Sequence, residues 1–170
     1  MKTKHLFGKA QHSIKHGLPL ILSPRYFLMA QEIHKIFGAV ALQTGKFKCC
    51  HRTDMFNHET YVAFLEDIVG YFCDQQYKKI FLIQDNASYH KHPDTYAWFS
   101  KNRKYVEVFN LPPYCPELNG AEKIWWHTRS CATHNRYYDT VEELCAALGT
   151  TFDFLKNNPS KILQLLAGFS

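Results

Sequence analysis

Two acidic residues lie at positions where their carboxylates could act together on a ligand. Asp85 follows the continuous apolar run of residues 80–83, which predicts a strand buried on both faces. Glu122 opens a predicted helix that comes after a second predicted strand, residues 105–111. These elements could converge on one edge of a sheet. Two ionised carboxylates brought together repel each other unless a cation lies between them.

The segment between the two acids determines how they are placed. Residues 112–116 include Pro112, Pro113 and Pro116, and this composition is typical of a stiff, extended loop. The loop leads to a helix with Trp125 and Trp126, which we expect in the core. Glu122 is three, four and seven residues before Trp125, Trp126 and Arg129, and this spacing places it on their helix face.

Each polar residue of this segment also has a structural interpretation. The pair Asp85-Asn86 readily forms a local turn at a strand end. Asn119 and Glu122 have the spacing of a helix capping box. His90 is next to Lys91 and His92 and would suit an exposed surface. These alternatives remain open at the level of sequence.

The other segments predict alternating strands and helices. Residues 33–42 and 46–52 predict a hairpin, and Asn57 is a candidate N-cap for a helix that reaches about residue 73. Further helices are expected from Pro93, from Thr140 with Glu143 as a capping box, and from Pro159. This order predicts an α/β mixed sheet with helices on both faces.

Several of these segments resemble one family. They are residues 85–90 (DNASYH), residues 111–119 (LPPYCPELN), Glu122 with Trp125, and the upstream residues 37–46 and 56–65. From residue 37 to residue 133 the chain resembles the DDE-type transposases, in particular the mariner-like group of insertion-sequence transposases. The resemblance implies a ribonuclease H-like fold. It also implies an enzyme of DNA transposition that cleaves and joins DNA by two-metal phosphoryl transfer.

The resemblance also implies roles for individual residues. Asp85 and Glu122 would be the second and third acids of a catalytic triad that holds two Mg²⁺ or Mn²⁺ ions, with Asn86 and His90 supporting them. Lys123 and Arg129 are candidates for contact with DNA phosphates, although solvated surface charge is the simpler explanation. The expected partners are DNA (transposon ends and target DNA) and further copies of the chain. A membrane is not expected, and the expected location is the cytoplasm.

One feature of the family is missing. Its first catalytic acid lies on the first strand of the fold, but residues 1–31 offer no convincing strand and are interpreted as a basic arm. Before Asp85 the only aspartates are Asp54, Asp67 and Asp74; none has the family position, and Glu32 lacks the surrounding motif. We therefore expect residues 1–170 to be one partial catalytic domain, incomplete at its amino terminus and inactive alone. The alternatives are a non-catalytic nucleic-acid-binding or regulatory transposase remnant, and an α/β module whose motif is incidental.

Composition is consistent with a DNA-binding protein. Residues 1–53 hold nine Lys or Arg and one acid, whereas residues 54–170 hold eleven and fourteen. A basic segment of this kind suits contact with phosphates, although a solvated basic arm explains it equally well. The six cysteines form no C-x-x-C pair, so we expect reduced cysteines that act as small apolar residues.

Overall fold

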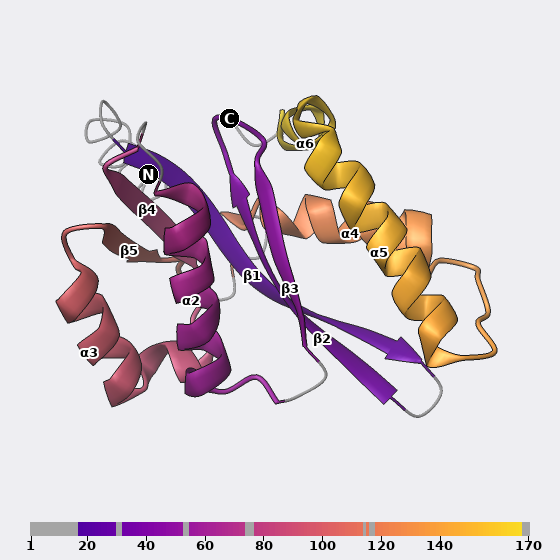
Figure 1. The fold of residues 1–170 in the computed structure, drawn as a ribbon, viewed down its shortest axis with the longest axis horizontal. Coiled ribbons are helices and arrows are strands. Elements are labelled where there is room, and N and C mark those ends of the chain that lie inside the picture. Colours follow the sequence, from indigo (N-terminus) through magenta and orange to yellow (C-terminus); the bar gives the residue numbers. More distant parts are fainter. Residues whose placement is uncertain are drawn as a thin grey trace.

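The computed structural model describes residues 17–29, 32–52, 55–73, 77–113, 115 and 118–167. Five strands form one mixed sheet in the order β3-β2-β1-β4-β5 (Figure 1). The strands β1, β2 and β3 pair antiparallel, whereas β4 is parallel to both β1 and β5. Their bounds are Gly17–Met29 (β1), Glu32–Ala41 (β2), Phe47–Arg52 (β3), Lys79–Gln84 (β4) and Val106–Asn110 (β5).

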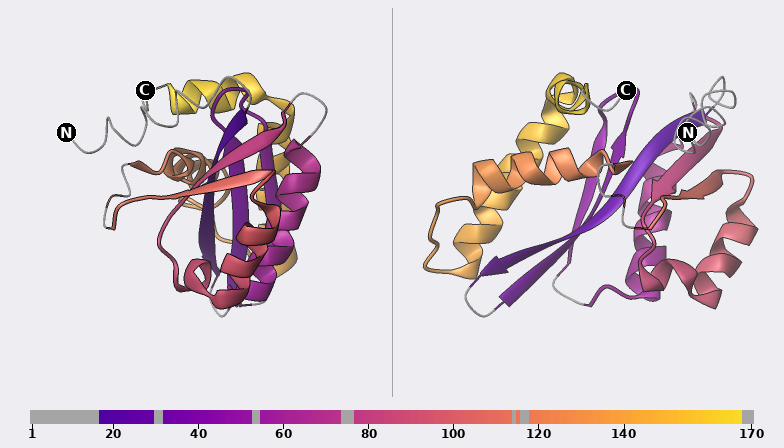
Figure 2. Two further views of the ribbon diagram at one scale, coloured as in Figure 1. Left: turned by 90° about the vertical axis from the view of Figure 1, so that its left-hand side faces the viewer. Right: turned by 180° about the vertical axis from the view of Figure 1, so that it is seen from behind.

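Helices cover both faces of the sheet, as the sequence predicts (Figure 2). The helix α2 (His58–Phe72) packs on one face against alternate residues of β1, Leu18, Leu20 and Leu22. The short helix η2 (Ser88–Lys91) and α3 (Pro93–Asn102) follow β4. The helices α4 (Ala121–Ala132), α5 (Val141–Asn157) and α6 (Pro159–Leu166) enclose a second core with Ile21 and Ile83. The sheet is therefore the middle layer of three.

The strand β1 corrects the prediction for residues 1–31. A strand of 13 residues lies at the centre of the sheet, where a basic arm is expected, so the sheet does have its first strand. Pro19 and Pro24 hide this strand in the sequence, because proline normally argues against a central strand. The parallel pairing of β1 with β4 ends at Ile21, and Pro24 lies beyond that point, where β2 is its paired neighbour. Residues 1–16 lie outside the described part.

The other strands and the starts of α2, α3, α5 and α6 agree with the sequence prediction to within one or two residues, whereas the short helix η2 is not predicted. Asn57 caps α2 and forms a reciprocal pair with Thr60, in which each side chain accepts a hydrogen bond from the other's backbone N–H (2.8 and 3.2 Å). Thr140 caps α5 by accepting from the Glu143 N–H (3.3 Å). The Glu143 carboxylate returns to the Asp139 N–H (3.0 Å), one residue earlier than a capping box requires.

The two tryptophans of α4 have different environments. Trp125 is 1% exposed and packs over Gly38 of β2, as expected of a core residue. The prediction is wrong for Trp126, which is 66% exposed. Successive helix residues point about 100° apart, because an α-helix has roughly 3.6 residues per turn, so burial of one does not bury the next. Within the described ranges, no helix is both long and apolar enough to cross a membrane.

Candidate functional site

Asp85 and Glu122 line the same pocket, which has a volume of about 250 Å³. Asp85 directly follows β4, and Glu122 lies in the first turn of α4. Because β4 and β5 are parallel, their carboxyl ends meet at one edge of the sheet, and the pocket opens there. The residues that line it are Asp85, Asn86, Leu111, Pro112, Pro113, Cys115, Asn119 and Glu122. Tyr114, Pro116 and Glu117 of the proline-rich loop lie outside the described residues.

Asp85 forms the local turn that its sequence suggests and also faces the pocket. Its Oδ1 accepts a hydrogen bond from the backbone N–H of Ala87 at 3.0 Å. Its side chain remains 40% exposed. The turn fixes the direction of the carboxylate without burying it, so the structural and functional interpretations of this residue are compatible.

His90 is a buried residue, so the interpretation as a surface histidine is wrong. The residue is 3% exposed, and burial lowers the pKa of its imidazole below the usual 6.5. A neutral ring donates its Nδ1 proton to the backbone carbonyl of Asp85, 2.9 Å away. The 3.3 Å approach of the same nitrogen to Asp85 Oδ1 is therefore a contact of a neutral ring and not a full ion pair. His90 supports the segment that carries Asp85.

Asn86 links the ends of the two parallel strands. Its side-chain amide donates to the carbonyl of Leu111, the residue after β5. Two residues earlier, the Gln84 amide donates to the Asn110 side-chain oxygen at 2.9 Å. These contacts set the separation between the chain at Asp85 and the start of the proline-rich loop.

Glu122 pairs with a residue that the sequence interpretation does not include. Asn119 accepts from the Ala121 N–H through its side chain (3.2 Å) and from the Glu122 N–H through its carbonyl (2.9 Å). The Glu122 carboxylate itself lies 3.1 Å from the guanidinium of Arg25 on β1. An ion pair between β1 and α4 therefore holds this carboxylate, where the sequence suggests a capping box.

Arg25 connects β1 to the pocket through its contact with Glu122, and Ser23 lies two residues before it on the same strand. Ile21 pairs with Ile83, the last pair between β1 and β4, and continuing this register by two residues would bring Ser23 level with Asp85. Ser23 is 2% exposed, and Arg25 is the next residue on the same face of β1. A search for acids misses these two residues. The detectable signal is the side-chain alternation of a strand, which places residues 21, 23 and 25 on one face.

Lys123 and Arg129, the predicted DNA contacts, are neighbours of the exposed Trp126. They lie three residues before and three residues after it on α4, and residues at this spacing are adjacent on a helix surface. Lys123 is half-buried and Arg129 is exposed. The stripe of Lys123, Trp126 and Arg129, called the α4 stripe below, combines positive charge with an exposed aromatic ring.

Comparisons with known proteins agree with this fold. A family model described as DDE superfamily endonuclease matches residues 31–145. The chain is 26% identical over 113 residues to the insertion element IS630 uncharacterized 39 kDa protein of Shigella sonnei, an alignment that covers 66% of this chain and 32% of that protein. The chain therefore spans about a third of this relative.

Solved structures show the same architecture. The catalytic domain of the Mos1 mariner transposase superposes with a TM-score of 0.66 at 14% identity, over 95% of this chain and 84% of that one. A structure of that domain with Raltegravir and Mn gives a TM-score of 0.64 at 14% identity, over 94% and 84% of the two chains. The sheet and its helices have the ribonuclease H-like fold.

Proposed function

Because this chain belongs to the DDE superfamily endonucleases, we propose that it is the catalytic-domain part of an insertion-element transposase whose substrate is DNA. The observation that carries the proposal is that Asp85 and Glu122 line one pocket although 36 residues separate them in sequence. Transposon ends and target DNA would be the nucleic-acid partners, and a second copy of the chain would be a protein partner. Such a protein would meet its DNA in the cytoplasm.

The charges at the pocket do not fit two divalent ions. Magnesium and manganese prefer oxygen ligands, and Asp85 and Glu122 supply two carboxylates. The strand β1 adds the Arg25 guanidinium, which contacts Glu122. No third carboxylate lines the pocket among the residues that the structure describes. A guanidinium 3.1 Å from Glu122 already supplies the positive charge that a metal ion would bring.

We therefore propose that this chain alone does not cleave DNA. Two-metal phosphoryl transfer needs ions on both sides of the reacting phosphate, roughly 3.5–4 Å apart, and carboxylates that hold them there. Continuing the register in which Ile21 pairs with Ile83 would bring Ser23 level with Asp85, and the family resemblance implies an acid on this first strand. A serine in that place leaves the site one charge short.

A second function fits the same charges. The chain could act as a regulatory remnant that binds DNA, or an intact transposase, and does not cleave DNA. The Arg25–Glu122 ion pair favours this candidate, because it ties one acid of the pocket to a protein cation. The α4 stripe would provide contact with phosphates and bases.

A metal-dependent nicking assay tests these proposals. The wild-type chain should not nick supercoiled DNA with Mg²⁺ or Mn²⁺. The double variant Ser23→Asp with Arg25→Ala restores the third acid and removes the competing cation, so it should bind Mn²⁺ more tightly and gain nicking that Asp85→Asn abolishes. Nicking by the wild-type chain that disappears in Asp85→Ala would contradict the proposed inactivity.

DNA binding separates the catalytic remnant from the regulatory one. Salt-dependent binding that survives both Asp85→Ala and Glu122→Ala would favour the non-catalytic function. If the folded double variant neither binds Mn²⁺ nor nicks DNA, the assignment of Asp85 and Glu122 as metal ligands is wrong.

A further inference from the structure

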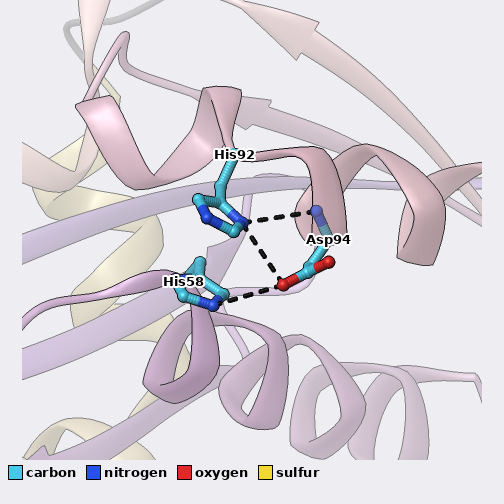
Figure 3. A group of neighbouring side chains, drawn as sticks. All are labelled: His58, His92 and Asp94. Atoms are coloured by element: carbon cyan, nitrogen blue, oxygen red, sulfur yellow. Dashed lines mark hydrogen bonds and ion pairs between the residues drawn. The ribbon is translucent and has the colours of Figure 1, made fainter.

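A second group of potential metal ligands lies away from the pocket. His58, His92 and Asp94 come together where α2 and α3 begin (Figure 3). The Asp94 Oδ2 atom lies 3.3 Å from His58 Nε2 and 3.4 Å from His92 Nδ1. One ligand atom from each residue lies within 4.8 Å of the other two. None of the three residues lines the pocket of Asp85 and Glu122.

Two well-defined helix starts hold these side chains in place. His58 is the first residue of α2, and Asn57 caps this helix, so the His58 ring is not needed as a cap. His92 is the N-cap of α3, Pro93 follows it, and Asp94 lies in the first turn. The three side chains are 29%, 40% and 70% exposed in the order His58, His92, Asp94, so an ion could reach them from solvent.

The spacing of the ligand atoms suits a small ion. Nitrogen and oxygen ligands bound about 2.0–2.1 Å from a tetrahedral ion lie roughly 3.4 Å from each other. The two separations from Asp94 Oδ2 in the structure, 3.3 and 3.4 Å, are close to this value. An ion could therefore bind at nearly the present spacing of these atoms, once the side chains have turned toward it.

We propose that His58, His92 and Asp94 bind a divalent transition-metal ion of the zinc class, such as Zn²⁺, Co²⁺ or Ni²⁺. Imidazole nitrogen is a preferred ligand of these ions, whereas Mg²⁺ prefers oxygen alone. Two neutral imidazoles and one carboxylate leave coordination positions for water. The site therefore selects against the ions that the family uses for DNA cleavage, and it is independent of the proposed function.

Three features of the structure limit the affinity. The two imidazole rings stack with centroids 3.6 Å apart and planes 12° apart, so one ring must turn before both lone pairs can point at one ion. His92 Nδ1 also accepts a hydrogen bond from the Asp94 N–H at 3.3 Å, and it would give up this weak cap. The positive ends of two helix dipoles oppose a cation, and the Asp94 carboxylate offsets them.

The ion would fix the segment that carries Asp85. His92 and Asp94 follow η2, which holds His90, and His90 bonds to the backbone of Asp85. His58 belongs to α2, the helix that the ion would connect to the start of α3. Metal binding would link α2 to α3 and so restrain residues 85–94. The role that we propose is thus structural.

Titration of the metal-free chain, without a polyhistidine tag, with Zn²⁺ or Co²⁺ tests the site. We expect one ion to bind at this cluster. Bound Co²⁺ should show the visible d–d absorption of a four-coordinate ion, and Zn²⁺ should raise the thermal midpoint of unfolding. Since loss of even an outer partner weakens metal sites about 10–100-fold, His58→Ala and Asp94→Asn should each raise the Kd at least about tenfold and abolish the thermal shift.

The matched controls concern two other pairs of potential metal ligands among the described residues. His127 and Cys131 lie four residues apart on α4 with Sγ and Nε2 3.6 Å from each other, so they are a competing pair. The variant His127→Ala with Cys131→Ser, and the variant Asp85→Ala with Glu122→Ala, should keep the ion at wild-type affinity. Circular dichroism without metal verifies the fold of each variant, and if His58→Ala unfolds, Asp94→Asn carries the test. Wild-type affinity in Asp94→Asn, or no binding of Zn²⁺ and Co²⁺ by the wild-type chain, would overturn the proposal.

Discussion

At the scale of single residues, the ion pair of Arg25 and Glu122 should affect cation binding at the pocket more than it affects the stability of the fold. Both side chains are partly exposed, at 25% and 33%, and an ion pair in such a position contributes at most about 1 kcal/mol to stability. The Arg25 Nε atom is buried and has no partner within the described part of the chain. The guanidinium is therefore held chiefly by its contact with Glu122.

Removing this guanidinium should alter metal binding and leave stability nearly unchanged. For Arg25→Ala we expect tighter binding of Mn²⁺ at the pocket, because Glu122 loses its competing cation, and a change in unfolding free energy below about 1 kcal/mol. Calorimetric titration with Mn²⁺ and urea unfolding measure the two effects. Lys79→Ala is the matched control, because it breaks the exposed Lys79–Glu107 pair (2.7 Å) far from the pocket. Equal effects of both variants on Mn²⁺ binding would contradict this account.

His90 should make the fold sensitive to mild acid. Burial lowers its folded-state pKa below the usual 6.5, so as the pH falls below 6.5 the unfolded chain takes up a proton before the folded chain does. The stability present above that pH is lost as the pH falls toward the folded-state pKa. We expect His90→Gln to flatten this decline in urea-unfolding free energy. At pH 8 the imidazole is neutral in both the folded and the unfolded chain, so the difference in unfolding free energy between variant and wild type at this pH measures the lost packing separately. An unchanged slope in the variant would show that another group causes it.

Some of the site could be inferred from residue types, and some could not. Asp85 and Glu122 belong to one motif, and the parallel strands before them bring them to one edge. Arg25 escapes a sequence search for metal ligands because it is a cation, and it reaches Glu122 from a distant strand. His90 has charged neighbours in sequence, but the turn that follows Asp85 directs its ring inward.

At the scale of elements, local signals predict most helices and strands, because caps and periodicity are encoded within a few residues. Asn57 with Thr60, Pro93 and Thr140 all mark helix starts at the positions observed. The strand β1 pairs with β2, which follows it directly, and also with β4, which is distant in sequence. Its two prolines contradict its local pattern, and its central place in the sheet depends on β4, a partner that is distant in sequence.

The packing of α4 on the sheet depends on the absence of a side chain at Gly38. A Cβ atom there would lie 2.5 Å from Trp125 Cη2, so Gly38→Ala should force Trp125 or α4 to move and destabilise the fold by about 1–3 kcal/mol. Urea unfolding measures this change. Gly149→Ala on α5 is the control, because nothing lies within 4 Å of its Cβ position, and we expect a gain of about 0.4–1 kcal/mol. No loss of stability in Gly38→Ala would mean that α4 is not positioned through Trp125.

At the scale of the whole molecule, the ribonuclease H-like sheet presents its pocket and the α4 stripe through the same helix. Glu122, in the first turn of α4, faces the pocket, while Trp126 and Arg129 lie further along the helix and are exposed. If DNA approaches the pocket, we expect it to run along this stripe. The sequence indicates Lys123 and Arg129 by charge, but the exposure of Trp126 follows from the orientation that Trp125 imposes on the helix.

DNA binding should therefore depend on the α4 stripe and on ionic strength. Trp126→Ala should weaken binding of single-stranded DNA by about 1–3 kcal/mol, the usual contribution of an aromatic ring stacked on a base. Arg129→Ala should lower the slope of log K against log salt by about 0.7–0.9, the value for one phosphate contact. Fluorescence anisotropy over a range of salt concentrations measures both effects. Tyr96→Ala is the control, because Tyr96 is 56% exposed on α3, outside the stripe. Wild-type affinity and slope in both α4 variants would place the DNA contacts elsewhere, with the basic residues 1–53 as the next segment to test.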